Sequence, residues 1–184
     1  MNQKELINKL KQDNTTLVKF ARNLKTLSIE DMQAKENEDW SITDCIEHMN
    51  ISMEVYLNQI LPRLATDLKP KNGPYKPGWL AAYFAKGMEP TDEGKIKHKM
   101  KTFKKLDPKQ VSRNVNELER FIQNIETTIE ITERIKEKNL KSFKVKTALG
   151  SWLKFYLGDA LWFYTAHNLR HMLQIQNMLK NTVL

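Results

Sequence analysis

Four stretches of the chain repeat apolar residues at alternating spacings of three and four, the pattern of a helix that buries one face. They cover approximately residues 2–27, 43–66, 108–137 and 158–180. Each stripe must be buried against another element, so four long stripes favour an all-α four-helix bundle. At 184 residues the chain is expected to form a single domain, residues 1–184.

Local signals mark where two of these helices begin. Ser41 is predicted to cap the second helix, with Asp44 facing back toward it from the third helical position. Asp107 followed by Pro108 predicts the start of the third helix. Pro62 is expected to loosen the last turn of the second helix.

The connections between the helices differ in character. Residues 28–40 are polar and turn-like, whereas residues 68–107 form a long crossover between the second and third helices. Within that crossover, residues 79–87 are apolar enough to form a short helix that packs as a lid. Residues 139–157 are predicted to be an extended crossing segment rather than a helix.

Composition limits the cell compartment and the partners. One cysteine excludes an internal disulfide framework and a cysteine-based zinc site. The polar N-terminus lacks the apolar core of a secretory signal, and no apolar run is long enough to span a bilayer, so we expect a cytoplasmic protein with no membrane partner. The net charge is +8, and seven lysines crowd into residues 95–109, but only one aromatic residue lies among them, which disfavours a nucleic-acid partner.

Two of the four histidines, His167 and His171, are four residues apart in the last predicted helix and therefore lie on one helical face. Such a pair can bind one transition metal but needs a further protein ligand, either His48 or His98. We favour His48, because His98 lies between two lysines in a predicted loop. The alternative is that all these histidines are ordinary surface or partly buried residues.

The residue after His167 is not the glutamate that a helical metalloprotease uses as its general base, so that class of enzyme is excluded.

Several of these residues together resemble a known family. Trp40-Ser41, Asp44, Glu47-His48-Met49 and the later run His167-Asn168-Leu169-Arg170-His171-Met172-Leu173-Gln174-Ile175 are similar to the DinB-like (YfiT-like) superfamily of metal-dependent enzymes. The resemblance implies a four-helix bundle whose second and fourth helices supply three histidines to a divalent metal, commonly zinc or nickel. The corresponding ligands here are His48, His167 and His171.

The resemblance also implies a reaction class. Three neutral imidazoles leave a coordination position open, and the metal would activate water or a low-molecular-weight thiol for hydrolysis or thiol transfer on a small molecule. The lysine-rich residues 95–109 would then attract an anionic substrate. The alternative is a non-catalytic binding or dimerisation module with a vestigial metal site. Because helical bundles of this kind often pair, a homodimer is also expected.

Three further residues are candidates for supporting the histidines. Asp44 lies one turn before His48 and could accept its spare ring N–H, or it could act only as a helix cap. Gln174 could orient His171 or a substrate, or be a buried amide. Tyr164 could donate a proton in the cleft, or simply pack with its hydroxyl in water.

Two other reactive side chains are expected to be structural. Arg170 lies off the histidine face of its helix, so we expect it to form an ion pair. Cys45 is expected to be a small buried thiol rather than a nucleophile or an extra ligand.

Overall fold

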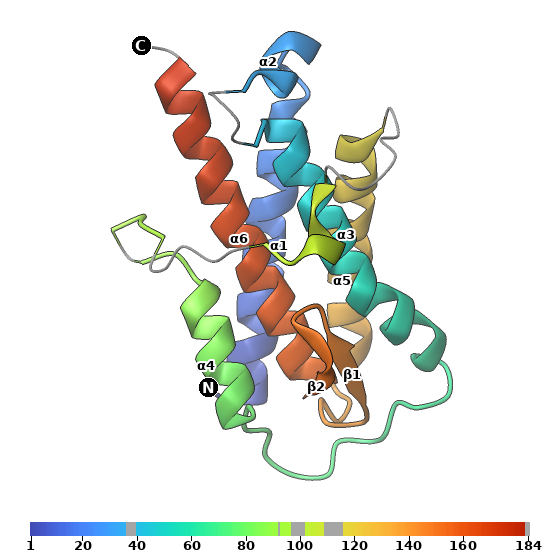
Figure 1. Cartoon of the computed structure of the whole chain (residues 1–184). Helices are drawn as coiled ribbons and strands as arrows, with labels where there is room; N and C mark the ends of the chain where they lie inside the picture. The colour runs from blue at the N-terminus through green and yellow to red at the C-terminus, as the bar shows by residue number, and fades with distance from the viewer. Residues whose placement is uncertain (36–39, 92, 97–101, 109–115, 183–184) are drawn as a thin grey trace.

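The computed structural model describes residues 1–35, 40–91, 93–96, 102–108 and 116–182 (Figure 1). The expected all-α bundle is confirmed within these residues, with one small hairpin added. In chain order the elements are α1 (Gln3–Leu24), α2 (Ile29–Gln33), α3 (Ile42–Ile60), the 3-10 turn η1 (Leu61–Arg63), α4 (Trp79–Met88), the 3-10 turn η2 (Lys104–Leu106), α5 (Glu117–Ile135), β1 (Lys144–Thr147), β2 (Gly150–Tyr156) and α6 (Leu157–Thr182).

The bundle consists of α1, α3, α5 and α6. Helix α1 packs against α5 and α6, and α3 packs against the same two helices, so α3 and α6 are direct neighbours. Figure 1 shows that α1 and α6 run in one direction, whereas α3 and α5 run in the other. The predicted apolar stripes meet along the axis, where fully buried side chains include Leu10, Leu17, Ile46, Met53 and Ile125. Each such side chain contributes about 1.5–3 kcal/mol to folding.

The second predicted helix begins and ends as its sequence signals indicate. Ser41 Oγ accepts the backbone N–H of Asp44, and the Asp44 carboxylate accepts the backbone N–H of Ser41, which together form a capping box. At the other end Pro62 falls within η1, so the α-helix tightens to a 3-10 turn where proline removes a hydrogen-bond donor.

The structure corrects the prediction at two places, one an additional short helix and the other the start of the third predicted helix. Residues 28–40 contain the short helix α2, because Ser28 caps it by accepting the N–H of Asp31. No residue of α2 is buried, so it leaves no apolar stripe in the sequence. Helix α5 begins at Glu117 rather than near residue 108, because the preceding Asn116 has the non-helical angles φ −127° and ψ 33°. Residues 109–115 lie outside the described residues.

The segment 139–157 is extended, as predicted, but it forms an antiparallel hairpin of β1 and β2 with Val145 opposite Phe155. Both of these side chains are buried, and β1 packs against α3 and α6. The chain then enters α6 through Gly158, whose N–H donates to the Leu140 carbonyl at 3.0 Å. A Cβ at Gly158 would lie 2.9 Å from the Leu140 Cβ, so this close approach requires glycine.

The short helix predicted over residues 79–87 is present as α4, which lies along α6 on the outside of the bundle (Figure 1). Just after α4, Glu89 accepts a hydrogen bond from Trp162 Nε1 of α6 at 2.9 Å. Within the described residues, no helix combines the length and hydropathy that spanning a bilayer requires.

Candidate metal centre

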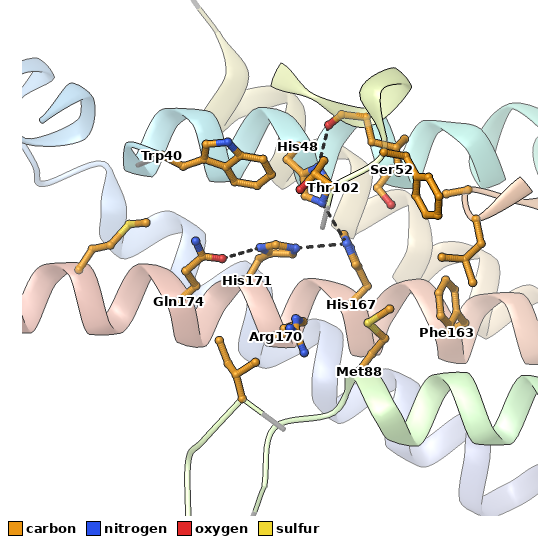
Figure 2. Close-up of a pocket in the computed structure, with 16 residues that line it drawn as sticks. Trp40, His48, Ser52, Met88, Thr102, Phe163, His167, Arg170, His171 and Gln174 are labelled. Atoms are coloured by element: carbon orange, nitrogen blue, oxygen red, sulfur yellow. Dashed lines mark hydrogen bonds between the residues drawn. The ribbon is translucent and has the colours of Figure 1, made fainter. Parts of the chain in front are cut away.

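Three imidazole rings converge between α3 and α6 (Figure 2). The Nε2 atom of His167 lies 3.1 Å from Nε2 of His48 and 3.2 Å from Nε2 of His171. All three residues are buried, with 4%, 9% and 8% of His48, His167 and His171 exposed. The structure therefore brings together the three histidines that the sequence analysis selected.

The helices explain this convergence. His167 and His171 are one turn apart on α6, so their rings lie along one face and meet edge to face, with ring centroids 4.5 Å apart. His48 comes from α3, which packs directly against α6. The ring of His48 thus meets the pair from the opposite helix, with centroids 5.0 Å from His167 and 4.7 Å from His171.

Two of the rings are oriented by oxygen acceptors. Nδ1 of His48 lies 2.8 Å from the carbonyl oxygen of Leu106 in η2, and Nδ1 of His171 lies 3.0 Å from Oε1 of Gln174. Because both oxygens only accept, each Nδ1 carries the proton and each Nε2 directs a lone pair toward the shared centre. This is the tautomer that a metal ligand needs.

Burial keeps these rings neutral. Desolvation lowers the pKa of His48, and it lowers the pKa of His171 to about 3, with the neighbouring His48 adding to that shift. The pKa of His167 is held well below its usual range by burial and by the two adjacent imidazoles. At neutral pH the cluster therefore offers unprotonated nitrogen ligands.

The donor set suits a divalent transition metal. Nitrogens bound tetrahedrally to zinc at about 2.0–2.1 Å are about 3.3 Å apart, and the two short separations here are 3.1 and 3.2 Å. Imidazole nitrogen suits zinc, nickel, copper and iron. Three histidines leave at least one position open for water or substrate, as in catalytic rather than structural zinc sites.

The histidines open into a cavity of about 600 Å³ between α3, α6, α4 and η2. Most of its wall is apolar, including Met88, Phe103, Phe163 and Met178, with a few polar groups such as Ser52. The indole of Trp40 covers one side of the cluster, with its centroid 4.8 Å from that of His48 and 6.1 Å from that of His171. The site is thus a mostly apolar pocket with three buried imidazole nitrogens in its wall.

The contacts of Asp44 and Tyr164 fit their structural alternatives, a helix cap and a packed tyrosine, rather than the catalytic roles. The carboxylate of Asp44 serves the capping box and pairs with Lys35 at 2.7 Å, and the Leu106 carbonyl receives the ring N–H of His48. Tyr164 is fully buried, with its hydroxyl 3.0 Å from Thr128 Oγ1 on α5. Its expected place in the cleft is therefore corrected, because it lies on the face of α6 that packs into the core.

Of the remaining candidate residues, Gln174 and Arg170 line the cavity and Cys45 is buried in the core. Gln174 lines the cavity beside His171. Arg170 lies in the cavity wall rather than away from it, and burial lowers the pKa of its guanidinium. Cys45 is fully buried, and desolvation raises the pKa of its thiol to about 12, which keeps it protonated and unreactive. His98 lies outside the described residues.

Sequence reasoning missed two contributors to the site. The Leu106 acceptor is a backbone carbonyl, so no residue type could have revealed it. Trp40 had a visible signal, a large aromatic residue directly before the cap of the histidine-bearing α3, but its contact with His171 depends on how α3 and α6 pack.

Comparison with known proteins gives one match. The model of the family described as the DinB superfamily matches residues 12–175, which includes all three histidines and most of the bundle. Neither the curated proteins nor the solved structures give a match to the chain.

Proposed function

This chain belongs to the DinB superfamily, and we propose that it is a metal-dependent enzyme that acts on a small molecule. His48, His167 and His171 would hold a divalent ion, zinc or nickel, with their converging Nε2 atoms. The observation that carries the proposal is the short separation of these three buried nitrogens, each in reach of one common centre. Neutral, desolvated imidazoles held this way repel one another's lone pairs unless a proton or a cation lies between them.

A bound ion would lower the pKa of a water or thiol at its open position and polarise a substrate oxygen. The residues of the chain would then bind and orient the reactants. Leu106 and Gln174 hold two of the ligand rings in the required tautomer. Trp40 and the apolar wall shield the three buried rings from bulk water, and desolvation strengthens charge interactions at the site.

The cavity supports a small-molecule substrate. Its volume of about 600 Å³ lies within the range of ligand pockets, and its wall suits a partly apolar molecule. We propose hydrolysis or thiol transfer, with a low-molecular-weight thiol as one reactant of the transfer. The attraction of an anionic substrate by residues 95–109 stays a prediction, because many of these lysines lie outside the described residues.

One observation favours the alternative, a binding or dimerisation module with a vestigial site. The described residues that line the cavity include no aspartate, glutamate, tyrosine or lysine that could act as a general acid or base. In an enzyme, an ion held by His48, His167 and His171 would supply the deprotonation of water or thiol that a separate base otherwise provides. The homodimer, the cytoplasmic location and the absence of a nucleic-acid partner stay predictions.

Metal content distinguishes the two functions. We expect protein purified without a nickel column to contain close to one divalent ion per chain, measured by elemental analysis. His171→Ala should lose that ion, whereas Tyr164→Phe, a change on the same helix but outside the cavity, should retain it. Wild-type protein that stays metal-free after incubation with zinc and nickel would exclude the enzyme proposal.

A further inference from the structure

Two segments of the chain are rich in lysine and contain no acidic residue. Residues 68–88, the crossover with α4, contain four lysines, and residues 138–158, which include the hairpin, contain five. All nine of these lysines are exposed. Because the whole chain has 30 basic and 22 acidic side chains, the residues outside the two segments carry a net charge of −1. The two segments therefore carry an excess of positive charge that the rest of the chain, taken as a whole, does not.

The fold places the two segments side by side. The backbone N–H of Asn139 donates to the Lys69 carbonyl at 3.0 Å, and the N–H of Lys69 donates to Ser142 Oγ at 3.0 Å. Farther along, Phe84 of α4 lies against Phe155 of β2, with ring centroids 6.3 Å apart. Figure 1 shows the crossover, α4 and the hairpin at the lower end of the bundle, whereas α2 lies at the upper end. Residues 68–88 and 138–158 thus form one basic end of the molecule.

The acidic residues that border these segments do little to offset the charge. They are Asp67, Glu89, Glu137 and Asp159. Asp67 pairs with Arg63, and Glu89 pairs with Lys9 at 3.1 Å. Asp159 is buried, so among the four bordering carboxylates Glu137 is the exposed one.

Three large aromatic side chains are exposed at the basic end. Trp79 and Tyr83 are 81% and 71% exposed and lie one turn apart on α4, and Trp152 of β2 is 78% exposed. The other side of α4 buries Ala81 and Ala85, where the helix packs against α6. Helix α4 is therefore apolar on both sides although only one side is buried, and an exposed apolar face of this kind marks an interaction site.

A polar hollow of about 310 Å³ also opens at the basic end. Its lining includes Lys71, Asn72, Asn139 and Lys141. The ammonium of Lys141 lies 5.9 Å from the ring centroid of Tyr75, which belongs to the same lining. A phosphate group accepts strong hydrogen bonds from ammonium groups, so the hollow suits the phosphate of a lipid headgroup.

We propose that the basic end is a docking surface for an anionic lipid bilayer. Lysines near such a bilayer are attracted to its negative surface potential. Trp79, Tyr83 and Trp152 each combine an apolar ring with a polar group, which suits the level of the lipid headgroups. Such a contact is peripheral and needs no spanning helix, so the lack of a spanning segment, on which the expectation of no membrane partner rested, does not oppose it.

Two other occupants fit this surface less well. A second copy of the chain, related by a two-fold axis, would bring the lysine-rich surface against itself, and like charges repel. A single-stranded nucleic acid is bound in a basic groove whose aromatic rings stack on the bases. Here the exposed rings of Trp79, Tyr83 and Trp152 lie outside the lining of the polar hollow. A bilayer requires no groove.

The first experiment measures binding of the full chain to vesicles by flotation. Vesicles of phosphatidylcholine with phosphatidylglycerol should bind the protein, whereas vesicles of phosphatidylcholine alone should not, and binding should weaken as salt is added. A chain that does not bind the anionic vesicles overturns the proposal. The basic end contains none of the three histidines, so this outcome is independent of the proposed function.

The second experiment tests the charge. Lys76→Gln combined with Lys154→Gln should weaken binding to the anionic vesicles about fivefold for each lysine. The matched control is Lys19→Gln combined with Lys25→Gln, which removes the same charge at exposed positions toward the upper end of α1 and should have little effect. Equal weakening in both pairs would mean that net charge alone attracts the protein, which overturns a defined docking surface.

The third experiment tests the aromatic side chains. Trp79→Gln combined with Tyr83→Gln should weaken vesicle binding by about tenfold or more. The control is Ile29→Gln, which removes a 71% exposed apolar side chain from α2 at the upper end and should bind like wild type. Wild-type binding by the aromatic variant overturns the proposal.

A readout in the wild-type chain does not depend on how the variants fold. The fluorescence emission of the exposed Trp79 and Trp152 should move to shorter wavelength when the anionic vesicles bind, and unchanged emission overturns the proposal.

Two further outcomes would assign the surface to another partner and overturn the proposal. One is a single-stranded oligonucleotide that binds at physiological salt and is lost in the Trp79→Gln, Tyr83→Gln variant. The other is a dimer in sedimentation that the same variant dissociates.

Discussion

At His171, burial and hydrogen bonding together prepare a single side chain for ligation. The residue is 8% exposed, and desolvation together with the nearby His48 lowers its pKa to about 3. Gln174 fixes the proton on Nδ1. A metal therefore meets a neutral nitrogen and does not have to displace a proton from it at neutral pH.

This lowered pKa makes the metal-free protein sensitive to mild acid. In the unfolded chain the imidazole has its ordinary pKa of 6.5 and binds a proton at pH values where the folded His171 does not. The contribution of His171 to the free energy of unfolding is therefore full above about pH 6.5 and falls as the pH drops toward 3. By about pH 5, His171 alone should cost about 2 kcal/mol. Urea unfolding at about pH 7.5 and about pH 5 measures this loss.

The control for this measurement is His171→Ala, which should lose less stability than wild type over the same interval. Half-buried Asp13 and buried Asp159 act in the opposite direction, because desolvation raises their pKa values, but both are present in the two proteins and cancel in the comparison. Equal losses in wild type and His171→Ala would show that the ring is not held neutral by burial.

At the scale of the element, α3 depends on a local signal at its start. The capping box of Ser41 and Asp44 satisfies two backbone N–H groups at a position that is 1% exposed. The same helix start places Trp40 against the rings of His48 and His171. The cap therefore contributes both to helix stability and to the cover of the site.

We expect Ser41→Ala to destabilise the protein by about 1 kcal/mol, within the usual range of about 0.5–2 kcal/mol for losing a cap. Ser28→Ala is a matched control, because Ser28 caps the exposed five-residue helix α2, which buries no residue. Its cost should be a few tenths of a kcal/mol, since α2 can fray without disturbing the core. Equal costs in urea unfolding would contradict the view that α3 depends on this cap.

At the scale of the whole molecule, the candidate centre joins helices that are far apart in sequence. His48 belongs to α3, and His167 and His171 belong to the last helix, α6. The unfolded chain does not hold these three rings together, so an ion that binds all three favours the folded state. Thermal stability should therefore depend on metal concentration.

Zinc at about 100 times its dissociation constant should stabilise the fold by about 2.7 kcal/mol. For a chain of this size, that corresponds to a rise in Tm of roughly 5–10 °C, measured by thermal unfolding monitored by circular dichroism. His171→Ala should show little change with zinc. A wild-type Tm that does not respond to zinc, in protein first stripped with a chelator, would contradict the linkage.

The sequence by itself determined the bundle, because three-four periodicity and the Ser41 cap are local properties that a helix needs wherever it packs. It also determined that His167 and His171 share a face, since helical geometry fixes the relation of residues four apart. The sequence did not predict the exposed helix α2, because α2 buries no apolar stripe. It also did not predict the hairpin of β1 and β2, which depends on pairing between two short strands.

Only the tertiary structure decided which groups surround the histidines. The Leu106 carbonyl reaches His48 because η2 folds back over α3, and Tyr164 points into the core because α5 covers its face of α6. The partnership of Asn14 with α6 likewise requires α1 to lie alongside. Periodicity states that a face is buried, but the identity of the atoms against it depends on which helices become neighbours, and that is decided by the packing of the whole chain.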